Sequence, residues 1–160
     1  MGTMEDLLSI EDRQRLPVVV GVDGSPRSKE ALAWAVRYAR AMGQPLRVVV
    51  AWRLPPSYGW EGPLPSEWDP EATAKEIGGA AVREALGDDP SMGCSIEVLE
   101  GHPARLLTEA SKHASLVVVG SRGRGEFAGM LLGSVSAFVT AHARCPVVVV
   151  RDGAEPQPTH

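Results

Sequence analysis

The chain has few of the residues on which several common protein classes depend. It contains two cysteines in 160 residues, Cys94 and Cys145, which lie far apart and outside any CxxC pattern. This spacing indicates neither a disulfide framework nor a zinc site, and we expect two reduced, buried thiols. No apolar run approaches membrane-spanning length, and the acidic start does not resemble a signal peptide. These absences predict a soluble, cytoplasmic protein with no membrane partner.

Positive charge is also scarce. The chain carries 16 Lys and Arg against 20 Asp and Glu, a formal net charge of -4, which argues against general binding to nucleic acid. Its only lysines are Lys29, Lys75 and Lys112. A GxxxxGK[ST] phosphate loop needs a lysine, so an ATPase of that type is disfavoured. The sequence GVDGSP after the first apolar run does not match the dinucleotide pattern GxGxxG either.

Short apolar runs, most of them rich in valine, recur along the chain and predict strands buried on both faces. The expected strands are 17–22, 46–52, 95–100, 116–120 and 146–151. Helical patterns lie between them. The clearest is 28–42, with Ser25 as N-cap and Pro26 as first position. Segment 70–86 is a weaker pattern because it contains Gly78 and Gly79. Further helices are expected from Pro103 and over 135–143.

This alternation predicts an α/β fold, one doubly wound, parallel, five-stranded sheet spanning residues 16–152. We expect Met42, Leu106, Leu107, Phe138 and His142 to lie on the inward stripes of their helices. Residues 1–15 and 153–160 are expected to be flexible. The Pro- and Gly-rich segment 53–69 is expected to form a long loop, either a lid or disordered.

Ligands bind such sheets beyond the carboxyl ends of the strands, where the connections change direction. Asp23 follows the first strand, so it either accepts hydrogen bonds from a ribose or holds a divalent ion, or only forms an Asx-type turn. After the fourth strand comes Gly120-x2-Gly123-x9-Gly133-Ser134. Glycines before a helix start suit phosphate. Alternatively, they serve positive-φ turns or helix packing.

Together these residues resemble the universal stress protein family in its ATP-binding branch, which the spacing G-x2-G-x9-G-[ST] marks. The resemblance includes VVVGVDGSPRSKEALAWA, RVVVAW, GHPARLLTEA and CPVVVVR and covers residues 16–151. It implies a flavodoxin-like sheet of the adenine nucleotide alpha hydrolase type, with strand order 3-2-1-4-5. It also implies ATP as the ligand, with Mg²⁺ or Mn²⁺ as an optional companion, and a homodimer formed through Val147–Val150.

The resemblance also assigns roles to residues. Asp23 and Gly120 would lie at the ribose, and the backbone of Ala51 at the adenine. The phosphates would be held by Gly123, Gly133, Ser134 and the amide of Val135, with Ser136 nearby. Apart from the resemblance, Arg122 and Arg124 in the glycine-rich segment either add charge to the phosphate site or are solvated. In the separate segment 53–69, Trp60 or Trp68 either covers the adenine or packs elsewhere.

No catalytic residue and no protein metal site is predicted. The serines lack a GxSxG elbow, and the histidines show no metal-like pairing. The sequence therefore favours ATP binding in a stress-response or regulatory dimer, without rapid turnover. Two alternatives stay open: a slow metal-dependent ATPase or phosphotransferase, and a nucleotide-free interaction module.

Overall fold

The computed structural model describes residue 12 and residues 15–54, 62–63, 65–89, 91–123 and 131–151. Its centre is a parallel sheet of five strands in the order β3-β2-β1-β4-β5. The strands are β1 (Val18–Gly21), β2 (Leu46–Trp52), β3 (Cys94–Glu100), β4 (Leu116–Gly120) and β5 (Val147–Val150). The predicted fold class and strand order are confirmed. The predicted flexible ends fall almost entirely outside the described residues.

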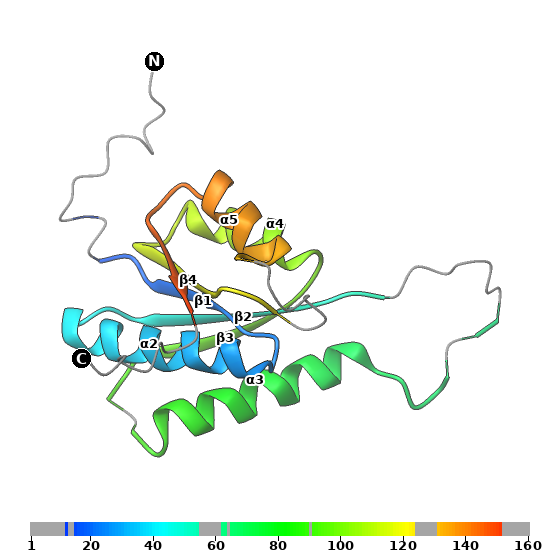
Figure 1. Cartoon of the computed structure of the whole chain (residues 1–160). Helices are drawn as coiled ribbons and strands as arrows, with labels where there is room; N and C mark the ends of the chain where they lie inside the picture. Colours follow the sequence, from blue (N-terminus) through cyan, green and yellow to red (C-terminus); the bar gives the residue numbers. More distant parts are fainter. Residues whose placement is uncertain are drawn as a thin grey trace, which may run out of the picture.

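Four helices cover the two faces of the sheet (Figure 1). On one face lie α2 (Pro26–Met42) and α3 (Pro70–Leu86), and on the other lie α4 (Pro103–Ser111) and α5 (Ser134–His142). Three of them begin with proline behind a side chain that caps the helix: Ser25, Asp69 and His102. The predicted cap of α2 is therefore confirmed. The described helices include none with the length and apolar character that a membrane span requires.

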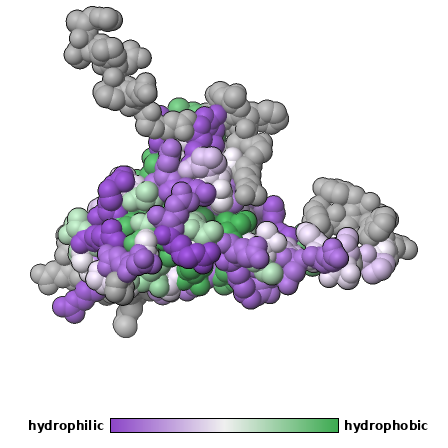
Figure 2. Space-filling view, turned by 90° about the horizontal axis from the view of Figure 1, so that it is seen from below, coloured by the Kyte–Doolittle hydropathy of each residue, from purple (hydrophilic) through white to green (hydrophobic). Residues whose placement is uncertain are grey.

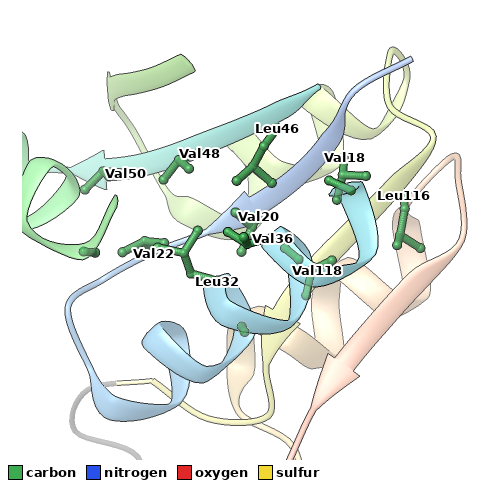
Figure 3. Packing of buried hydrophobic residues seen from close by; sticks show 14 of the residues in the cluster. Val18, Val20, Val22, Leu32, Val36, Leu46, Val48, Val50, Leu116 and Val118 are labelled. Atoms are coloured by element: carbon green, nitrogen blue, oxygen red, sulfur yellow. The ribbon is translucent and has the colours of Figure 1, made fainter. Parts of the chain in front are cut away.

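The central strands are buried on both sides, as their continuous valine runs predict. Val18, Val19 and Val20 are each 0 % exposed. Val18 and Val20 pack towards α2, where Figure 3 shows them beside Leu32 and Val36. Val19 belongs to the cluster beneath α4 and α5. Because β1 and β4 are buried on both faces, polar residues follow them only beyond their carboxyl ends, where Asp23 and Ser121 lie.

Gly78 explains why α3 forms despite two adjacent glycines. A Cβ at Gly78 would lie 2.9 Å from Val50 Cγ2 and 3.1 Å from Ile96 Cγ2. The missing side chain therefore lets α3 lie close against β2 and β3. A Cβ at Gly79 would meet only the end of the Arg83 side chain, at 3.2 Å. The first glycine serves packing, whereas the second has no such constraint.

Several predicted inward positions are wrong. Met42 is 48 % exposed because α2 ends at it, where Gly43, with φ 66°, reverses the chain. Phe138 is 37 % exposed and stacks on His142 outside the core, because α5 covers the edge of the sheet and buries only Ser136 and Val139. Leu106 is only partly buried, unlike Leu107.

Cys94 and Cys145 are thiols outside any disulfide, and both are half-buried, not buried as predicted. Cys94 begins the edge strand β3, and its partial burial raises the pKa of its thiol. The thiol of Cys94 is therefore protonated at neutral pH and is a poor nucleophile.

On the side of α2 and α3, Figure 2 shows mainly hydrophilic residues with a hydrophobic patch between them.

Candidate functional site

A pocket opens at the carboxyl ends of β1, β2 and β4, at the place where the strand order reverses. The empty space in it, including open solvent at its mouth, is about 630 Å³. The structure brings seven predicted site residues into its lining: Asp23, Ala51, Gly120, Gly123, Gly133, Val135 and Ser136. The eighth, Ser134, begins α5 between two lining residues.

Asp23 forms the predicted Asx-type turn and also borders the pocket. Its Oδ1 accepts a hydrogen bond from the Ser25 N–H at 2.8 Å, and Gly24 between them has φ 82°. Its other oxygen, Oδ2, lies next to Gly123, because a Cβ at that glycine would come within 2.8 Å of it. The turn thus fixes the carboxylate in the lining, so the two sequence interpretations of Asp23 are compatible.

The glycines of the motif do not adopt positive φ angles, and two of them, Gly120 and Gly123, allow close contacts instead. Gly120, Gly123 and Gly133 are not among the glycines with positive φ, and Gly133 has φ -72°. A Cβ at Gly120 would lie 3.1 Å from the backbone of Arg27, so this glycine lets the start of α2 approach β4. The helix-packing interpretation therefore holds for Gly120, whereas Gly123 leaves room beside a pocket carboxylate.

The start of α5 supplies a positive end to the pocket. Gly133 is its N-cap and offers no side chain to accept from the first amides, and the first turn has no acidic residue. The first N–H groups of a helix have no partner within the helix and carry its positive dipole. Arg122 adds a cation to the same lining. This end of the pocket therefore suits an anion.

Another part of the pocket lining is apolar. It consists of Val49 and Ala51 of β2, Val119 of β4, and Pro103 and Leu107 of α4. Gly21 leaves room for Leu107, since a Cβ on this glycine would lie 2.8 Å from Leu107 Cδ1. The sequence motifs did not single out Pro103 or Leu107 for the site, although both lie in the quoted segment GHPARLLTEA. An apolar lining together with an anion site suits a flat, uncharged ring that carries a phosphate.

Ser136 has a different environment from the other motif residues. It is 2 % exposed, and its hydroxyl lies 2.9 Å from the Ser121 carbonyl oxygen and 3.1 Å from that of Gly133. A serine hydroxyl has one proton, so these carbonyls account for its donor capacity. Ser121, which the sequence reasoning missed, is itself 3 % exposed. The only signal for it was a polar residue directly after a buried strand.

Other candidates from the sequence lie elsewhere. His102 belongs to the turn before Pro103, as predicted, and its Nδ1 accepts from the Ala104 N–H at 3.2 Å. No cluster of three or more His, Cys, Asp or Glu suited to a metal occurs in the part of the chain that the structure describes. Trp68 is 38 % exposed. Trp60 and Arg124 lie outside the described residues, as do residues 55–61 and 64 of the predicted long loop.

Fold and pocket together define a doubly wound α/β domain with a small-molecule cleft at the reversal of strand order. The model of the universal stress protein family matches residues 15–151. The chain therefore belongs to the universal stress protein family, as the sequence motifs indicated.

Individual relatives agree with this assignment. A universal stress protein from Mycolicibacterium smegmatis is 40 % identical over 141 residues, which are 86 % of this chain and 46 % of that protein. The chain thus spans about half the length of the curated relatives it matches.

Two solved structures share the fold and contain adenine nucleotides. A universal stress protein in complex with cAMP is 29 % identical, with a TM-score of 0.64, and the match covers 86 % of this chain and 97 % of that one. The universal stress protein from Archaeoglobus fulgidus in complex with dAMP is 26 % identical, with a TM-score of 0.59, covering 84 % and 96 %.

Proposed function

We propose that this domain binds adenine nucleotides, ATP among them, in the pocket between β1 and β4, and acts as a cytoplasmic regulatory homodimer in stress physiology. The observation that supports this most strongly is the lining of the pocket, which combines apolar side chains with the start of α5, where the N-cap Gly133 has no side chain. The adenine would lie between Ala51 and Leu107, the ribose near Asp23, and the phosphates at Gly123, Ser134 and Val135. The cAMP and dAMP complexes of relatives support the ligand class.

The nucleotide content of the purified protein tests the proposal directly. We expect the denatured protein to release an adenine nucleotide, identified by absorbance and mass, or the emptied protein to bind added ATP or AMP. Protein that releases none and refuses both would contradict the proposal and favour a nucleotide-free interaction module.

A divalent ion would enter this site with the phosphates. Asp23 is the one carboxylate in the described lining of the pocket, and a single carboxylate together with phosphate oxygens is a usual set of ligands for Mg²⁺. The lining fits such an ion, whose chemistry would be to neutralise phosphate charge. We propose binding without rapid hydrolysis, because the described lining contains neither a lysine nor a histidine.

The proposed dimer would form through the outer edge of β5. Towards β4, the carbonyls of Pro146 and Val150 accept from the Val117 and Ser121 N–H groups at 3.0 and 2.8 Å. Backbone groups of alternate strand residues point to the same side. Val147 and Val149 therefore direct their N–H and C=O groups to the outer edge, where a second copy can pair.

Proline at position 149 tests this pairing. We expect Val149→Pro to convert the dimer to a monomer, because it removes an outward N–H while leaving the bonds to β4, a substitution that edge strands tolerate. Val149→Ala keeps the N–H and should stay dimeric. Sedimentation analysis gives the mass of each variant. A dimeric Val149→Pro protein, or a monomeric parent, would rule out this interface.

A further inference from the structure

Ser121 contacts three elements around the glycine-rich segment. Its N–H donates to the Val150 carbonyl of β5 at 2.8 Å, and its Oγ accepts from Arg27 Nη1 of α2 at 3.3 Å. Its carbonyl accepts twice, from the Gly133 N–H at 2.6 Å and from Ser136 Oγ at 2.9 Å. Residue 121 therefore joins the end of β4 to the start of α5.

These contacts join Ser121, directly after β4, to Gly133, directly before α5. The chain leaves β4 at Ser121 and returns at Gly133, and both ends meet at the same carbonyl. The Ser136 hydroxyl reaches the carbonyls on both sides of this closure, at Ser121 and at Gly133.

We infer that Ser136 is a positioning residue that holds Gly133, at the start of α5, against Ser121, at the end of β4, through the Ser121 carbonyl. This inference rests on the proposed nucleotide binding, but it assigns Ser136 a role different from a phosphate contact. The closure fixes Arg122 and Gly123 relative to Gly133 and Val135, which line the anion end of the pocket. When these groups are already held in place before the ligand binds, binding costs less conformational entropy.

The printed contacts of the Ser136 hydroxyl go to Ser121 and Gly133 and to none of the apolar lining residues. Of those, Val49 belongs to β2, and Pro103 and Leu107 belong to α4. Loss of the Ser136 hydroxyl should therefore weaken binding of the phosphate and leave binding of the base nearly intact. A serine that only stabilised the fold would weaken both together.

Amide hydrogen exchange and binding, measured on the full chain, separate these roles. In nucleotide-free Ser136→Ala, we expect exchange at the Gly133 amide to be about fivefold faster, as for the loss of one hydrogen bond. The Ser121 amide, bonded to Val150, should be unchanged. The affinity for AMP should fall about fivefold, and the affinity for adenosine less than about twofold.

Two matched serine variants serve as controls. Ser134→Ala removes a proposed phosphate contact, so it should lower the AMP affinity without changing exchange at Gly133. Ser111→Ala removes another buried hydroxyl, 1 % exposed, which accepts from the Arg144 N–H at 2.8 Å. It lies outside the pocket lining and should change neither measurement.

Unchanged exchange at Gly133 in Ser136→Ala would overturn the inference, and so would equal losses of AMP and adenosine affinity. If the parent protein binds neither ligand, the proposed function fails, and with it the role of Ser136 in binding. The exchange measurement then still decides whether Ser136 holds Gly133 against Ser121.

Discussion

Gly123→Val is expected to lower the affinity for AMP or ATP by at least about 100-fold, equivalent to ~2.7 kcal/mol. Already the first carbon of a side chain at this position would lie 2.8 Å from Asp23 Oδ2. The branches of valine would extend further into the space assigned to ribose and phosphate. The carboxylate would have to move, and its Asx-type turn with Ser25 would move with it. Titration calorimetry gives both affinities.

Gly93→Val provides the matched control. Gly93 lies at the other end of the sheet, before β3, and a Cβ there would meet only Pro45 Cβ, at an ordinary 3.8 Å. We expect this variant to bind as the parent does, and both variants to keep the circular dichroism spectrum of the parent. A folded Gly123→Val protein with undiminished affinity would show that the nucleotide binds elsewhere.

The second large effect concerns stability and the adjacent glycines of α3. Gly78→Ala should lower the free energy of unfolding by about 1 kcal/mol, since overpacking costs about 1–3 kcal/mol and the gain in helix propensity offsets about 1. Val50, which the new methyl group would meet, is only 2 % exposed and has little room to move. Gly79→Ala should instead raise the free energy of unfolding by up to about 1 kcal/mol.

Urea denaturation of both variants measures this difference, expected to be about 2 kcal/mol. The pair is closely matched, because the same atoms are added at neighbouring positions of one helix. Equal stabilisation by both substitutions would mean that α3 does not pack on β2 and β3 as closely as the structure has it.

The strands and helices could be predicted well because local sequence patterns agree with the packing of the folded chain. The valine runs coincide with strands buried on both faces, and proline behind a capping residue marks where α2 begins. The resemblance assigned most of the candidate site residues, and topology explains why they meet, because parallel strands end at one edge of the sheet. For this reason Asp23, Ala51 and Gly123 line one pocket although they are distant in sequence.

What the sequence could not provide was the outcome of contacts between elements. Apolar periodicity gives the face on which Met42 and Phe138 lie, but not whether another element covers it. Likewise, the motif gave Ser134 and Ser136 similar roles. Only the distances to the Ser121 and Gly133 carbonyls show that the second hydroxyl is engaged within the protein.

The composition of the pocket also determines how it can be studied by mutation. Several of the proposed polar contacts come from backbone amides, those of Gly123 and Val135 among them, and glycines leave part of the room in the cleft. Alanine scanning removes side-chain atoms, so it would pass over these contacts and underestimate the site. Substitutions that add atoms to the glycines are the informative ones.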